Sequence, residues 1–173
     1  MERFTKLLAT PSTPSILTGV ILCAVVASQA MSDTILTVTG DVAPASEGTQ
    51  WKFEENDLHA LPLVQFETDT IWTEGTQTFE GVSLSALLTH VGASNGTLLA
   101  TAANDYTVSI PTSDAVENGP IIAYLRNGEK MSLRDKGPLW IVYPFAGNDT
   151  YKTEEYYSRS IWQLDRIEVV ADE

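Results

Sequence analysis

The hydrophobic and polar positions first alternate regularly across residues 35–40. Leu36 and Val38 are apolar, and threonine stands at the positions between and after them. An alternation with a period of two is typical of a β-strand that buries one face. We therefore predict an opening strand that ends at Gly40. The next segment, residues 41–50, carries proline, serine and glycine and is expected to be a loop.

Further extended segments follow, and turn-forming residues separate several of them. Strands are expected at Thr97–Ala103 and Tyr106–Ile110, on either side of Asn104 and Asp105, which favour turns. The pair Asn127-Gly128 is a strong hairpin signal. The other segments that we expect to be extended are Leu58–Phe66, Ile121–Leu125, Leu139–Tyr143 and Trp162–Val170.

One segment has the spacing of a helix. Apolar residues recur every three or four positions from Leu84 to Val91, with Ser83 as a suitable N-cap and Gly92 as a suitable end. A short turn or helix start is expected at Pro111–Asp114. Many short strands with few helices predict a single compact domain of the α+β class, mostly β.

The first thirty residues differ from the rest of the chain. Arg3 and Lys6 precede an apolar run from Ile16 to Ala27, and small residues follow up to Ala30. This order is typical of a secretory signal peptide. We expect residues 1–30 to be the signal peptide and residues 31–173 to be the exported domain, located in the periplasm.

Two alternatives concern how this segment is used. A retained membrane anchor is one, although the apolar run is shorter than the roughly 20 residues that span a bilayer. A lipoprotein anchored through Cys23 is the other, although bulky Leu22 precedes that cysteine where a small residue is required. After cleavage we expect no direct membrane insertion.

Charge and residue counts exclude several functions. The formal net charge is −13, which disfavours nucleic acid and anionic lipid as partners. Cys23 is the one cysteine and His59 and His90 are the two histidines, with no partners at metal-ligand spacing. The sequence has no glycine-rich phosphate loop and no context for serine–histidine–acid catalysis.

Aromatic and polar residues near the carboxyl end suit a flat heterocycle. Trp140 and Trp162 could stack on a ring, Arg159 could donate to its carbonyl and ring nitrogens, and Asn104 or Asp105 could accept from its amino group. Each has a simpler explanation, because tryptophans in strands are often core residues. Arg159 could equally pair with a neighbouring glutamate on the surface.

Several motifs, in this order, resemble the sulfite-oxidase-fold family, whose domain binds molybdopterin. Phe66, Thr68, Trp72 and Thr73 follow the Phe-x-Cys-x-x-x-Trp-Ser pattern of its methionine-sulfoxide-reductase branch. The other matching segments are Ala102–Pro111, Ile122–Tyr124 with Asn127–Glu129, Gly137–Leu139 and Arg159–Leu164. The resemblance runs from about Ile35 to Val170 and implies the family's fold.

Three departures from the family pattern bear on function. Thr68 stands at the place of the cysteine that ligates molybdenum, and a neutral hydroxyl is a poor ligand for a soft metal. Trp140 replaces an arginine and Ile161 a lysine that the enzymes use near the cofactor's phosphate. We therefore expect no catalytic activity, no metal and no catalytic cofactor.

The chain is most similar to PruR-type periplasmic pterin-binding regulatory proteins. That resemblance implies a reduced pterin as ligand and, as partner, the periplasmic domain of an inner-membrane cyclic di-GMP cyclase/phosphodiesterase. The alternatives are a molybdopterin-dependent oxidoreductase and an interaction module with a collapsed pocket. The residues expected to bind the ligand are Thr68, Asn104, Tyr106, Trp140, Tyr143, Arg159 and Trp162.

Overall fold

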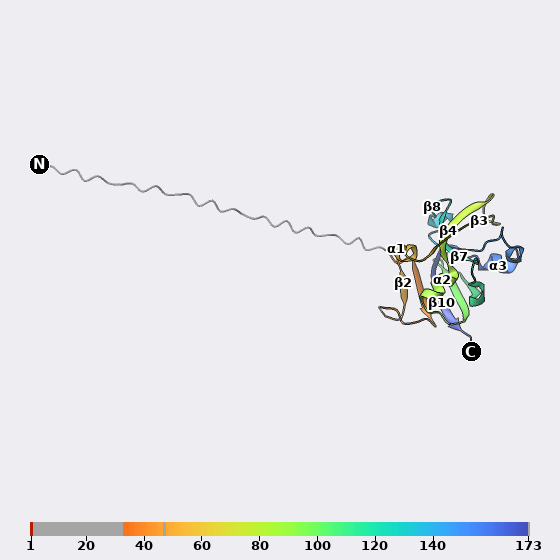
Figure 1. Cartoon of the computed structure of the whole chain (residues 1–173), viewed down its shortest axis with the longest axis horizontal. Coiled ribbons are helices and arrows are strands. Elements are labelled where there is room, and N and C mark those ends of the chain that lie inside the picture. Colours follow the sequence, from red (N-terminus) through yellow and green to blue (C-terminus); the bar gives the residue numbers. More distant parts are fainter. Residues whose placement is uncertain (2–32, 47, 173) are drawn as a thin grey trace. The chain divides into compact units, whose positions relative to one another are not determined.

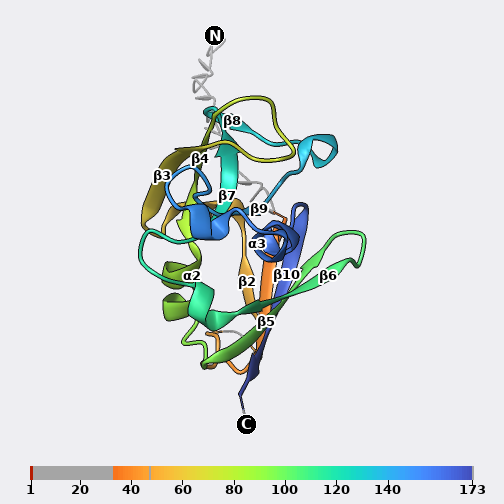
Figure 2. The ribbon, with the colours of Figure 1, turned by 90° about the vertical axis from the view of Figure 1, so that its right-hand side faces the viewer.

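The computed structural model describes Met1, residues 33–46 and residues 48–172, and Figures 1 and 2 show its ribbon. Apart from Met1, the predicted signal peptide at residues 1–30 lies outside these described residues. Among the described helices, none combines the length and the apolar character needed to cross a bilayer.

The first sheet has five strands in the order β2-β1-β10-β5-β6 (Figure 2). β1 (Leu36–Gly40) and β10 (Leu164–Ala171) run parallel, and the other neighbours are antiparallel. The remaining strands are β2 (Trp51–Phe53), β5 (Gly96–Ala102) and β6 (Thr107–Pro111). The last strand of the chain therefore lies in the middle of this sheet and fixes the residues just before it.

The second sheet has the order β3-β4-β7-β8, with β9 also paired to β7. Its strands are β3 (Leu63–Thr68), β4 (Gln77–Ser83), β7 (Ile121–Arg126), β8 (Glu129–Lys130) and β9 (Trp140–Val142). The β7–β8 turn is formed by Asn127 and Gly128, both at positive φ, as the hairpin signal predicted.

The second sheet buries apolar side chains on both faces. Ile141 of β9 and Ile122 of β7 belong to the main core, together with apolar residues of the first sheet. Trp140 and Val142, one position away, belong to a second cluster with Phe79. Because successive side chains of a strand point to opposite faces, the single strand β9 contributes to both clusters.

The predicted helix is confirmed as α2 (Leu84–His90). The hydroxyl of Ser83 accepts a hydrogen bond from the backbone N–H of Ala86 at 3.0 Å, which caps the first turn. Gly92 follows with φ +60°, a conformation that glycine adopts without strain. The helix packs its three leucines into the main core.

The extended segment predicted at residues 58–66 is wrong in its first part. Residues up to His59 belong to α1 (Glu55–His59), and the strand β3 starts only at Leu63. A capping box explains the difference, because Glu54 and Asp57 each satisfy the other's backbone N–H. These side-chain bonds favour a helical turn over an extended chain.

A third helix, α3 (Glu154–Arg159), was not predicted, nor was β2. None of the residues of α3 is fully buried, so it lacks the apolar stripe that sequence patterns reveal. Short 3₁₀ turns complete the described domain at Thr112–Asp114 (η1), Leu133–Asp135 (η2) and Asp149–Tyr151 (η3). The prediction of a single, mostly-β domain of the α+β class is confirmed.

Candidate ligand-binding site

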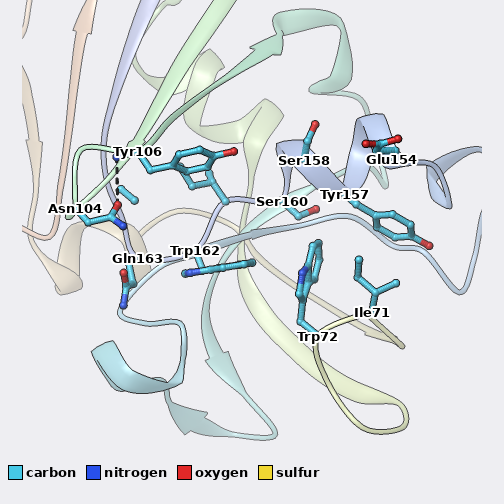
Figure 3. A pocket seen from close by; sticks show the side chains of 12 residues that line it. Ile71, Trp72, Asn104, Tyr106, Glu154, Tyr157, Ser158, Ser160, Trp162 and Gln163 are labelled. Carbon is cyan, nitrogen blue, oxygen red and sulfur yellow. Dashed lines mark hydrogen bonds between the residues drawn. The ribbon is translucent and has the colours of Figure 1, made fainter.

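A cavity of about 610 Å³ opens beside the end of the first sheet at which β10 begins. We call it the candidate pocket. Figure 3 shows the side chains that line it, which come from the β3–β4 loop, the β5–β6 turn and the segment from α3 to β10. The lining residues are Ile71, Trp72, Ala102, Asn104, Tyr106, Glu154, Tyr157, Ser158, Ser160, Ile161, Trp162 and Gln163.

Trp72 is the central aromatic residue of this site. Its ring meets those of Trp162, Tyr157 and Trp140 edge to face, at centroid distances of 5.6, 5.8 and 6.0 Å. Edge-to-face contacts of this kind hold aromatic rings in defined orientations. Trp72 also packs against both core clusters, so one wall of the pocket is continuous with the interior.

A short hydroxyl-capped turn holds Trp72 in place. The hydroxyl of Thr70 accepts a hydrogen bond from the backbone N–H of Trp72 at 3.1 Å and shares a second with the hydroxyl of Thr73 at 2.9 Å. Thr70 is itself buried. Threonine side chains that bond to nearby backbone groups stabilise turns, so this loop is built to orient the tryptophan.

Two large aromatic rings lie across the pocket from each other with faces open to solvent. Tyr106 is 57% exposed and Trp162 is 37% exposed, and Figure 3 shows them on opposite sides. The side-chain oxygen of Asn104 accepts from the backbone N–H of Tyr106 at 3.2 Å, which supports the turn carrying this ring. Open aromatic faces in a hollow are suited to a flat ligand.

Several polar side chains of the lining already form hydrogen bonds within the protein. The hydroxyls of Ser158 and Ser160 donate to backbone carbonyls of α3, at 2.7 and 3.0 Å. The amide nitrogen of Gln163 donates to a carbonyl of η2 at 2.6 Å. Ser160 is buried, and Glu154 is the one charged residue among those that line the pocket.

Thr68 lies inside the protein rather than on the pocket wall. It is fully buried, and its hydroxyl accepts a hydrogen bond from the backbone N–H of Ala146 at 2.9 Å while donating to the carbonyl of Asp69 at 3.2 Å. Both capacities of the hydroxyl are therefore used within the fold. The threonine ties the end of β3 to the segment after β9.

Arg159 and Tyr143 belong to a buried polar network beside the pocket. The Arg159 guanidinium donates to Asp114 at 3.0 Å and to Glu155 at 2.5 Å, and it packs over the ring of Tyr156. The Tyr143 hydroxyl donates to the same Asp114 oxygen at 2.7 Å. Burial, and then this hydrogen bond, raise the pKa of Tyr143 far above its ordinary value.

The network connects three segments that are distant in the sequence. Asp114 ends η1, Tyr143 follows β9, and Arg159 ends α3. The helix that carries Glu154, Tyr157 and Ser158 into the pocket is thereby held against the end of β6. Arg159 thus fixes the position of a pocket wall without lining it.

The structure brings together only some of the residues predicted to bind the ligand. Asn104, Tyr106 and Trp162 line the candidate pocket. Trp140 is fully buried, forms a β-bridge with Trp162 and donates from its indole nitrogen to the carbonyl of Ser160 at 3.2 Å. Of the other three, Thr68 and Tyr143 are fully buried, and Arg159 is partly buried in the network described above.

Sequence reasoning missed Trp72, Tyr157 and Glu154 as lining residues. Trp72 was part of the Phe66–Thr73 motif, so its signal was present but was used only to align the cysteine position. Tyr157 and Glu154 lie on α3, and no sequence pattern predicted this helix. Their approach to the pocket depends on the buried network.

The lining residues do not fit a molybdenum centre. Such a metal prefers soft thiolate ligands, and the charged group of the lining is a single carboxylate. Among the described residues, no three His, Cys, Asp or Glu side chains gather into a metal-binding group. The aromatic walls do fit a flat organic ring.

Two packed β-sheets with few short helices, and a pocket beside the start of β10, the central strand of the first sheet, are consistent with a sulfite-oxidase-like molybdopterin-binding fold. The profile of the family "Oxidoreductase molybdopterin binding domain" matches residues 26–172, and the chain belongs to that family.

Among solved structures, the fold is similar to that of the sulfane dehydrogenase SoxCD from Paracoccus pantotrophus. The TM-score is 0.59 at 19% sequence identity, over 79% of this chain and 38% of that chain. This chain therefore corresponds to well under half of that protein, and the similarity concerns the fold. A comparison with curated proteins found no match.

Proposed function

We propose that this protein is a periplasmic pterin receptor without catalytic activity, of the PruR type. A reduced pterin binds in the candidate pocket, and the liganded protein regulates the periplasmic domain of a membrane cyclic di-GMP cyclase/phosphodiesterase. The observation that carries the proposal is the pair of open aromatic faces, Tyr106 and Trp162, across a cavity of about 610 Å³.

The size and chemistry of the pocket support a bicyclic ring as ligand. Pockets of roughly 300–1,000 Å³ accept small molecules and cofactors, and this cavity lies within that range. Trp72 and Tyr157 extend the apolar wall beyond the two open faces. Asn104 and Gln163 place amide groups at one end, where the polar edge of a pterin needs partners (Figure 3).

The position of Thr68 supports a role without metal. The family resemblance aligns this residue with the metal-binding cysteine, yet its hydroxyl is fully buried and hydrogen-bonded to Ala146. A bound metal at that side chain would require opening the contact between β3 and the segment after β9. A ligand in the candidate pocket requires no such change.

A titration tests the ligand. We expect 7,8-dihydropterin to release or absorb heat on binding and to change the tryptophan fluorescence, because Trp72 and Trp162 line the pocket. Tyr106→Ala should weaken binding about fivefold or more, since aromatic stacking contributes about 1–3 kcal/mol per base in comparable sites. Leu63→Ala, which removes an equally exposed apolar side chain outside the pocket, is the matched control. An absence of binding at submillimolar pterin would refute the proposal.

A second measurement tests regulation. A ligand changes a partner's affinity only if it binds the free and the complexed receptor differently. The affinity of the purified protein for the sensor's periplasmic domain should therefore differ with and without pterin, and Tyr106→Ala should abolish that difference. Equal affinities in both conditions would leave pterin binding without a signalling role.

The second candidate function is a molybdopterin-dependent oxidoreductase, which family membership favours. Expression in a molybdenum-supplemented host followed by elemental analysis separates the two functions. Stoichiometric molybdenum in the purified protein would support the oxidoreductase. Its absence, together with pterin binding, would support the receptor.

A further inference from the structure

We propose that the candidate pocket selects an uncharged heterocycle rich in N–H donors and rejects relatives that carry a phosphate, molybdopterin included. This inference rests on the proposed function and names the ligand class of the same site. It depends on two properties of the lining, namely which hydrogen-bonding capacity remains open and which charge is present.

Several polar side chains of the lining offer hydrogen-bond acceptors to a ligand. Because the hydroxyl protons of Ser158 and Ser160 are donated to carbonyls of α3, their oxygens can only accept from a ligand. Gln163 donates through its nitrogen to η2, which leaves its side-chain oxygen as an acceptor. Glu154 adds a carboxylate, which only accepts when ionised.

The exposed acceptors of the lining carry this requirement. Ser158 and Glu154 are exposed, whereas Ser160 is only 2% exposed and loses little contact with solvent when a ligand binds. A ligand that covers Ser158 without offering it a donor would replace a solvated oxygen with one that lacks a partner. Sites built to hydrogen-bond a ligand discriminate strongly against analogues that lack the matching group. An aminopyrimidine edge and reduced ring nitrogens supply such donors.

The charge of the pocket opposes an anionic tail. Glu154 is the one charged lining residue, and the chain as a whole carries a net charge of −13. Phosphate groups in proteins are usually held by arginine, lysine or backbone N–H groups at helix starts. Here a phosphate would meet a carboxylate instead.

Two basic side chains, Arg159 and Lys136, lie beside lining residues without lining the pocket themselves. Arg159 is paired with Asp114 and Glu155. The ammonium of Lys136 lies 5.5 Å from the ring centroid of Trp162, but Lys136 does not line the pocket. Neither side chain therefore balances Glu154 inside the cavity.

The experiment compares two ligands that share one ring. The purified protein is titrated with 6-hydroxymethyl-7,8-dihydropterin and with its diphosphate ester. We expect the unphosphorylated compound to bind at least tenfold more tightly at low ionic strength. Salt should narrow the difference, because it screens a charge at the pocket mouth.

Two charge-changing variants test whether the pocket causes the preference for the unphosphorylated pterin. Glu154→Lys should reduce or invert the preference, whereas Glu168→Lys, which makes the same charge change on an exposed position of β10, should preserve it. The preference is a ratio of two affinities measured on one variant, so a uniform effect of a substitution on folding cancels. A preference unchanged in Glu154→Lys would overturn the role of this residue.

The outcomes separate this inference from the proposed function. If neither compound binds, the proposed function fails. If the diphosphate binds as tightly as the unphosphorylated pterin, the receptor function stands and the selectivity inference fails. Loss of that diphosphate binding in Lys136→Ala would then show that this lysine, rather than Glu154, sets the charge preference.

Discussion

The hydroxyl of Thr68 accepts a hydrogen bond at 2.9 Å from the backbone N–H of Ala146, a residue 78 positions later in the chain. This contact joins the end of β3 to the segment that follows β9. It uses the hydroxyl of the residue that the sequence resemblance aligns with the metal ligand, and it gives Thr68 a structural role.

Thr68→Val should therefore destabilise the domain while leaving the pocket residues unchanged. The substitution keeps the shape of the side chain but removes the part-buried hydrogen bond from the N–H of Ala146, and a typical hydrogen bond contributes about 0.5–1.5 kcal/mol. Chemical denaturation would measure this loss. Thr68→Ser keeps the hydroxyl and should recover most of it; an equal loss in both variants would contradict the role of the hydrogen bond.

Thr68→Cys should not create an accessible thiol. Because the position is fully buried, a thiol reagent should modify it far more slowly than the thiol of Ser158→Cys, which lines the pocket. The rates are measured on folded protein, with the denatured protein as reference. Equally fast modification of the two cysteines would show that position 68 opens to the cavity.

Trp140 and Trp162 should respond differently to truncation. Trp140 is fully buried among aromatic rings, so Trp140→Ala should cost about 3–5 kcal/mol of stability. Trp162→Ala should cost less stability and lower pterin affinity more, because part of its ring faces the pocket. Denaturation and calorimetry on both variants test the contrast, and identical profiles would refute it.

Arg159 and Asp114 should be energetically coupled. Removing either side chain leaves a mostly buried charge without its partner, so each single alanine variant should lose roughly 2–3 kcal/mol. The double variant should lose less than the sum of the two, by about 1–2 kcal/mol. The exposed pair Lys152–Asp149 is the control, for which Lys152→Ala should have little effect.

Stability should fall at alkaline pH because of Tyr143. Its pKa is raised in the folded state, so above about pH 10 the unfolded chain releases a proton that the folded chain retains. The unfolded state then binds fewer protons, and stability decreases with pH by up to ~1.4 kcal/mol per pH unit. Tyr143→Phe should remove this contribution to the slope, measured by denaturation between pH 9 and pH 11. An unchanged slope would contradict it.

Local sequence signals predicted the parts of the fold that local interactions stabilise. Ser83 caps the helix that it was expected to cap, and Asn127-Gly128 forms the expected turn. In contrast, α3 is held by Arg159 through an ion pair to Asp114, 45 positions earlier. No local pattern encodes such a contact, which is why this helix and its pocket residues were missed.

The difference between local signals and long-range contacts also explains which residues of the candidate site the sequence predicted. The sequence indicated aromatic residues suited to a flat ring, but Trp140 and Trp162 look alike in it. Pairing of β9 with β7 buries Trp140, whereas Trp162 lies just before β10 and lines the pocket. The motif around Thr68 suggests a place at a metal site, whereas its hydroxyl accepts a hydrogen bond from the backbone N–H of Ala146. No side-chain pattern in the sequence predicts that contact.

The parallel pairing of β1 with β10 has a practical consequence for surface-based assays. Thr34 shares a small hollow with Gln163, a pocket residue, whereas Ala171 pairs with Gly96 at the far end of the sheet (Figure 2). A sensor chip that captures the domain through a carboxyl-terminal tag should present the pocket to flowing analyte. Capture next to Thr34 would instead hold the pocket close to the chip.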